Sequence, residues 1–127
     1  MSGYSVNLEQ ATLDNDNFRR VLFTAAHSQL VLMSLRPGED IGLETHPHTD
    51  QFIRVESGHG EAVIGGQTYA LEDGSAIVIP AGSEHNVTNT STTKPMKLYT
   101  VYTPPEHPDG TLQHTKAEAM AAHHHAH

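Results

Sequence analysis

The sequence predicts an all-β domain, a sandwich or barrel, with one short helix near the C-terminus. Runs rich in Val, Ile, Leu, Phe, Tyr and Thr recur about every 8–12 residues across the middle of the chain. Gly, Pro, Asn and Asp, the usual turn residues, stand between these runs. The 127 residues suffice for one domain. They exclude a (β/α)₈ barrel, which needs roughly 200 residues or more.

Each expected element follows from its local pattern. Strands are expected at residues 18–24, 29–35, 51–57, 61–64, 67–71, 76–79, 86–90 and 96–103. Gly65-Gly66 is a hairpin signal between two of them. The first 17 residues are polar and are expected to be irregular. A helix is expected at 115–122, with Thr115 as N-cap and Glu118 three residues later.

Composition excludes several function classes. Fifteen acidic residues against seven basic ones give a net charge of −8, which disfavours nucleic acid or an anionic membrane as partner. The absence of cysteine excludes disulfides, thiolate metal sites and cysteine nucleophiles. No apolar run is long enough to span a bilayer and no signal peptide is visible, so a cytoplasmic location is expected. Eleven histidines are the one excess, and they favour imidazole ligation of a metal.

Two histidine-containing motifs carry the expected chemistry. His46 and His48 are two residues apart, so in a strand both would lie on one face and could reach one ion. The second motif has fixed residues at Gly74, Pro80, Gly82, His85 and Asn89. We expect its glycines and proline to shape the backbone and Asn89 to form structural hydrogen bonds.

These motifs resemble those of the cupins. The second cupin motif, G(x)5PxG(x)2H(x)3N, matches residues 74–89 at every fixed position, and the first, HxH(x)3–4E(x)6G, matches His46, His48 and Gly58. Gln51 stands where the family usually has Glu. The resemblance covers residues 30–103 and implies a double-stranded β-helix, a jelly-roll barrel, with metal inside. Residues 1–127 would form one cupin domain with a core at about 18–103, an extension at 104–122 and a His-rich tail at 123–127.

The resemblance also implies a ligand set. His46, His48 and His85 would bind a divalent transition metal (Mn, Fe, Ni, Co or Zn), with Gln51 in fourth place and Asp50 as the alternative. Because these four groups are neutral, we expect the ion to favour an anionic, oxygen-rich small molecule. Candidates for a catalytic base are Glu44, Asp50, Tyr99 and Tyr102, of which only one tyrosine should point inward.

Three functions follow from this resemblance. The leading one is a Lewis-acid isomerase or tautomerase acting on a sugar-like or keto/hydroxy-acid substrate, similar to small cupins of the mannose-6-phosphate-isomerase-like type. The alternatives are an iron-dependent dioxygenase and a non-catalytic binding protein. The family also suggests a homodimer. Residues 104–111 are expected to form a surface loop that ties down the helix, although they could instead fold over a barrel end and bring Glu106 or His107 to the site.

Overall fold

The chain forms two antiparallel sheets and two helices. The computed structural model describes residues 2–125, and the side chains of residues 2–122. The helices are α1 (Leu8–Asp14) and α2 (Lys116–His125). The strands are β1 (Arg19–Thr24), β2 (Gln29–Leu35), β3 (Asp50–Ser57), β4 (Gly60–Ile64), β5 (Gln67–Leu71), β6 (Ala76–Ile79), β7 (His85–Asn89), β8 (Met96–Thr103) and β9 (Leu112–Gln113). None of the helices in this described part of the chain is long and apolar enough to cross a membrane.

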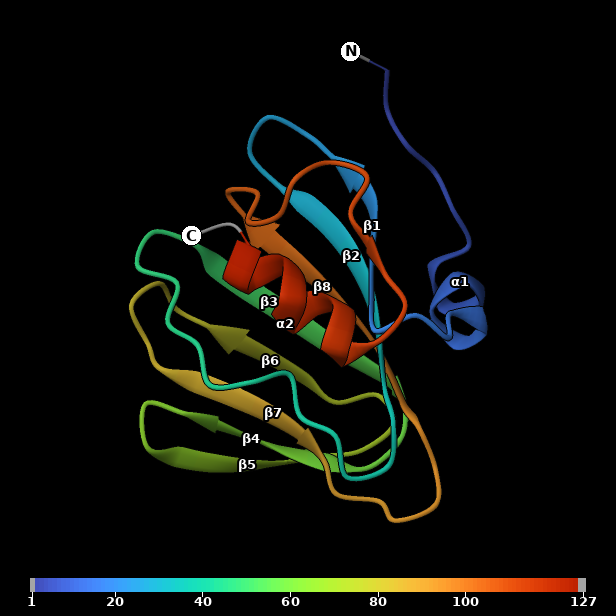
Figure 1. The fold of residues 1–127 in the computed structure, drawn as a ribbon, viewed down its shortest axis with the longest axis vertical. Coiled ribbons are helices and arrows are strands. Elements are labelled where there is room, and N and C mark those ends of the chain that lie inside the picture. The colour runs from blue at the N-terminus through green and yellow to red at the C-terminus, as the bar shows by residue number, and fades with distance from the viewer. Residues whose placement is uncertain (1, 126–127) are drawn as a thin grey trace.

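The sheets face each other as a sandwich (Figure 1). The larger has the order β6-β3-β8-β2-β1-β9 and the smaller the order β5-β4-β7. The segment between β2 and β3 runs beside β7, where Asp40 pairs with Thr88 and Glu44 pairs with His85. The prediction of an all-β sandwich with a short C-terminal helix is therefore confirmed, and the eight expected strands match β1–β8 within one residue at each end.

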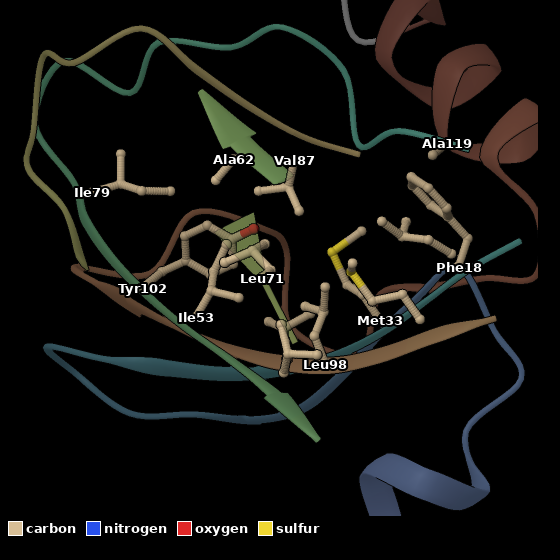
Figure 2. Close-up of a cluster of buried hydrophobic side chains, with 14 of the residues drawn as sticks. Phe18, Met33, Ile53, Ala62, Leu71, Ile79, Val87, Leu98, Tyr102 and Ala119 are labelled. Carbon is tan, nitrogen blue, oxygen red and sulfur yellow. The ribbon is translucent and has the colours of Figure 1, made fainter. Parts of the chain in front are cut away.

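Alternation along the strands fills the space between the sheets. In β3, Gln51, Ile53 and Val55 are buried while the residues between them are only partly covered. Side chains from both sheets meet in one apolar cluster, which Figure 2 shows with Ala119 of α2 near Phe18. Each fully buried Leu, Ile or Val stabilises the fold by roughly 1.5–3 kcal/mol relative to an exposed one. This core fixes the register of the strands that carry the polar residues described below.

Asn89 ties the end of β2 to the loop between β7 and β8. Its side chain is fully buried. The amide nitrogen Nδ2 donates to the backbone oxygens of Leu35 and Arg36, both at 3.1 Å, and of Lys94 at 2.9 Å. Its Oδ1 accepts from the backbone N–H of Ser91 at 3.0 Å. The expected structural role of Asn89 is confirmed, because every polar atom of this buried amide has a partner.

The expectation of an irregular N-terminus was wrong for α1. Asn7 caps this helix by accepting at Oδ1 from the N–H of Gln10 at 3.1 Å. The helix has only seven residues and little apolar periodicity, so its sequence gave a weak signal. Tertiary contacts hold it in place: Nζ of Lys97 donates to the backbone oxygen of Asn15 at 2.6 Å and to Oδ1 of Asp16 at 2.8 Å.

Helix α2 covers one open side of the sandwich. Thr115 accepts at Oγ1 from the N–H of Glu118 at 3.1 Å, which confirms the expected N-cap. Lys116 pairs with Asp40 on the segment beside the smaller sheet, and Ala119 packs into the core. The helix ends at His125, beyond the expected residue 122. The side chains of the His-rich tail lie outside the described residues.

Candidate metal centre

Three possible metal ligands lie beside the start of β7, an edge strand of the smaller sheet: Glu44, His46 and His85. Each offers one ligand atom, and these atoms all lie within 4.8 Å of one another. Backbone pairing brings two of them together, because the N–H groups of Glu44 and His85 each donate to the other's carbonyl oxygen at 2.9 Å. His46 follows Glu44 by two residues, and the side chains of these two residues are in contact.

Each histidine of the cluster has its Nδ1 next to an oxygen atom. Nδ1 of His85 is hydrogen-bonded to the backbone oxygen of Ser83 at 2.9 Å, and Nδ1 of His46 lies in an ion-pair contact 3.0 Å from Oε1 of Glu106. Because a carbonyl oxygen can only accept, Nδ1 of His85 carries the proton and the lone pair of its Nε2 is free. Metal-binding histidines in proteins are oriented by partners of this kind.

The contact between His46 and Glu44 has the geometry of two ligands of one ion. Nε2 of His46 and Oε2 of Glu44 lie 2.9 Å apart. They are not aligned as donor and acceptor, and Nε2 is buried without a hydrogen-bond partner. Two atoms bound at right angles to one ion at ~2.1 Å would lie about 3 Å apart. The residues present therefore fit a metal ion.

Glu44 and His46 each stabilise the charged form of the other. The close Glu44 carboxylate raises the pKa of His46, burial opposes this, and Glu106 adds to the increase. Burial alone would raise the pKa of Glu44, but the neighbouring His46 and the charges of Arg19 and His85 outweigh it and lower that pKa. The carboxylate of Glu44 is thus ionised and available as a ligand at neutral pH.

Gln51 offers a further oxygen next to this cluster. Its side chain is buried, and Nε2 donates to Oγ1 of Thr100 at 3.1 Å. This bond directs Oε1 away from Thr100, and Oε1 is buried without a partner. Gln51 is paired in register with Tyr102, whose ring lies 6.0 Å from that of His46. A buried oxygen left unpartnered costs roughly 1–3 kcal/mol, which a bound ion or ligand would offset.

Of the other predicted site residues, the structure places His48, Asp50 and Tyr99 away from the cluster and Tyr102 beside it. His48 is exposed and is not part of the cluster, because Pro47 and His48 form a turn and not the strand that the spacing of His46 and His48 predicted. Asp50 is exposed and accepts at Oδ1 from the N–H of Ala81 at 2.8 Å. Tyr102 points into the core, whereas Tyr99 packs against Phe52 at 6.3 Å between ring centres.

Comparison with known proteins decides the family. A model described as "Cupin domain" matches residues 31–102, more than half of the chain. The chain belongs to the cupin family. This match confirms the resemblance to cupins that the two motifs showed. It does not distinguish the mannose-6-phosphate-isomerase-like type from other cupins.

The relatives of this cupin are close in sequence and structure. It is 51% identical to the uncharacterized protein YrkC of Bacillus subtilis (strain 168), over 94% of this chain and 67% of that protein. It is 48% identical to the uncharacterized protein L612 of Acanthamoeba polyphaga mimivirus, over 86% of this chain and 70% of that protein. The crystal structure of BH2720 from Bacillus halodurans is 50% identical with a TM-score of 0.92, covering 94% of this chain and 95% of that one.

Residues 104–107, here called the strap, are bound from the interior of this cupin. Pro104 and Glu106 are exposed, as expected for a surface loop, but the stated alternative also holds, because Gln29 binds the backbone of this part of the segment from inside the sandwich. Oε1 of Gln29 accepts from the N–H groups of Glu106 at 3.2 Å and His107 at 3.0 Å, and its Nε2 donates to the oxygen of His107 at 2.7 Å. Gln29 is 1% exposed, so the strap is held by a buried side chain.

The strap brings two side chains to the site. Glu106 contacts His46, as described, and also accepts at Oε2 from Oγ1 of Thr49 at 3.2 Å. The ring of His107 packs edge-on against Tyr102, with 5.1 Å between ring centres, and its Nε2 is buried without a partner. Burial lowers the pKa of His107 to about 3 and raises the pKa of Tyr102 above its ordinary range. His107 is therefore uncharged and Tyr102 protonated at neutral pH.

Proposed function

We propose that this cupin holds a divalent transition metal ion through Glu44, His46 and His85, with Oε1 of Gln51 as a further donor. The observation that carries the proposal is the set of three ligand atoms within 4.8 Å, one of them a buried nitrogen with no hydrogen-bond partner. Two imidazoles, a carboxylate and an amide oxygen suit Mn, Fe, Co, Ni or Zn. Glu44 supplies the negative charge that Gln51 lacks, so the site carries less positive charge than a set of four neutral ligands would leave.

We further propose that the protein is an isomerase or tautomerase acting on a small keto/hydroxy-acid or sugar-like molecule. The ion would supply Lewis acidity toward a carbonyl or hydroxyl oxygen of the substrate. Glu106 holds the ring of His46 in place through Nδ1. Tyr102 stays protonated and can donate a hydrogen bond or a proton. His107 is neutral, and it would accept a proton only transiently because burial holds its pKa at about 3.

Metal titration tests the first part of this proposal. The full chain with His123, His124, His125 and His127 replaced by alanine removes binding by the tail, and calorimetry after dialysis against EDTA measures affinity. We expect E44Q and H85A to weaken binding roughly tenfold or more, since each loses a ligand. H48N is the matched control and should bind like the parent. Failure of all five metals to bind, or equal losses in H48N and E44Q, would contradict the assignment.

A substrate screen tests the second part. The loaded protein is offered small keto acids, hydroxy acids and sugars under argon and under air, and products are followed by NMR. Conversion under argon without net oxidation supports an isomerase or tautomerase. Oxygen consumption with the iron form would instead identify a dioxygenase, and saturable binding without turnover at any metal loading would identify a binding protein.

A further inference from the structure

Arg19 is a buried cation without a counter-ion in the described part of the chain. It is 6% exposed and lies on β1, on the same inward face as Val21 of the core. No carboxylate lies within 4.0 Å of its guanidinium among residues whose side chains are described. A buried charge of this kind is costly unless it is paired, so the fold is arranged for a partner that the described side chains do not supply.

Hydrogen bonding leaves one edge of the guanidinium free. Nη1 of Arg19 donates to Oε1 of Gln113 on the neighbouring strand β9 at 2.8 Å. Its Nε is buried and has no partner. The guanidinium carbon lies over the Phe18 ring, 5.2 Å from its centre, at the distance of a cation–π contact. A planar carboxylate is the group that matches a fixed guanidinium edge, through two parallel N–H···O bonds.

The charge of Arg19 acts on the candidate site. Burial is the main cause of the low pKa of His107, and the positive charge of Arg19 comes next. Burial raises the pKa of Tyr102, and Arg19 is the first of the charges that oppose it. Arg19 also contributes to the low pKa of Glu44. Strand pairing supports this placement, because Arg19 is paired in register with Met33 of β2, and Met33 and Tyr102 belong to the same core cluster between the sheets.

Unpartnered polar atoms share this interior. Among the described side chains, the buried nitrogen or oxygen atoms without a hydrogen bond include Nε of Arg19, Nε2 of His46, Oε1 of Gln51 and Nε2 of His107. Native proteins leave few such atoms, and each implies a missing partner. They comprise a donor on Arg19 and possible ligand atoms on His46 and Gln51, which are the two kinds of group that a molecule with an anionic end and a metal-binding oxygen would contact.

We propose that Arg19 is a carboxylate-binding subsite beside the metal centre, with His107 as a neighbouring hydrogen-bond partner. The ligand is therefore a small carboxylic acid that carries a second oxygen function, such as a 2-hydroxy or 2-keto acid. This inference rests on the proposed function for the position of that second oxygen. The binding of the carboxylate to Arg19 itself does not require the metal.

Binding of simple carboxylates tests the subsite. The probes are glycolate and pyruvate, with glycolamide as the uncharged control and inorganic phosphate as a competing anion. They are titrated by calorimetry into the full chain with its four tail histidines replaced by alanine, both free of metal and loaded. We expect R19Q to weaken glycolate and pyruvate binding roughly tenfold or more, because a charge-assisted pair is lost. Glycolamide, which carries no charge, should bind the parent more weakly than glycolate does, by a factor similar to the loss expected for R19Q.

Two further variants keep the result interpretable. R20Q removes an exposed arginine from the adjacent position of β1 and should leave carboxylate binding unchanged. R19K keeps the positive charge but lacks the planar guanidinium that can form two parallel hydrogen bonds, so it should bind glycolate more weakly than the parent. R20Q should bind the metal like the parent, and R19Q should bind it at least as tightly, because it loses a positive charge that acts on Glu44. Glycolate binding that is equal in R19Q and the parent, or absent in every form, would overturn the subsite, as would tighter binding of phosphate. If the parent binds carboxylates but no metal ion, that result would count against the proposed function and not against the subsite.

Discussion

Replacing His107 with phenylalanine should make the folded protein less sensitive to acid. The imidazole of His107 lies against Tyr102, and its Nε2 is buried without a partner. Burial, followed by the charge of Arg19, holds its pKa at about 3, below the ordinary value of 6.5. Phenylalanine preserves an aromatic edge against Tyr102 and removes the unpartnered nitrogen.

The magnitude follows from the two pKa values. Between pH 6.5 and about 3, the unfolded chain binds a proton at His107 and the folded chain does not. Stability from this group is therefore fully present above pH 6.5 and is lost as the pH falls, at about 1.4 kcal/mol per pH unit. At pH 5 the loss amounts to about 2 kcal/mol. The H107F variant lacks this loss.

Urea unfolding of the metal-free protein at pH 7 and pH 5 measures the effect. The difference between the parent and H107F should change by about 2 kcal/mol between the two pH values, in favour of H107F at pH 5. H59Q removes an exposed imidazole and serves as control. Equal losses of unfolding free energy in the parent and H107F would refute the reasoning, since His107 would then take up its proton in the folded state.

Three other predictions concern the residues that support the site. Q29L should lower the free energy of unfolding by roughly 2–4 kcal/mol, because the N–H groups of Glu106 and His107 in the strap lose their buried acceptor. Urea unfolding measures this change, and a loss below about 1 kcal/mol would contradict the prediction. N89A should cost roughly 2–4 kcal/mol in the same assay, since the buried amide is removed and three backbone carbonyl oxygens lose a donor, and N89D, which cannot donate to them, should not restore stability. Metal affinity measured by calorimetry should fall with falling pH from above pH 6.5, since the raised pKa of His46 makes protons compete with the ion, and a flat profile between pH 8 and 6 would exclude His46 as a ligand.

Local pattern was sufficient for most of the fold. The positions of β2, β5, β6 and β8 follow from runs of apolar residues bounded by Gly and Pro, and the N-cap of α2 follows from Thr115 and Glu118. Helix α1 was missed because its seven residues have little propensity of their own and are held by Lys97, more than eighty residues away. Strand β9 has only two residues and exists because β1 offers it an edge.

The sequence by itself determined the fold class and singled out His46 and His85 as members of two histidine motifs, because both conclusions depend on spacing within short stretches. Only the tertiary structure decided which neighbours join them. A turn at Pro47-His48 directs His48 to solvent, and pairing with His85 brings in Glu44, two residues before His46. The roles of Arg19, Gln29 and His107 depend on contacts between residues as far apart as 29 and 107. No local pattern encodes such contacts, since they arise only when the strands pack and water leaves the space between them.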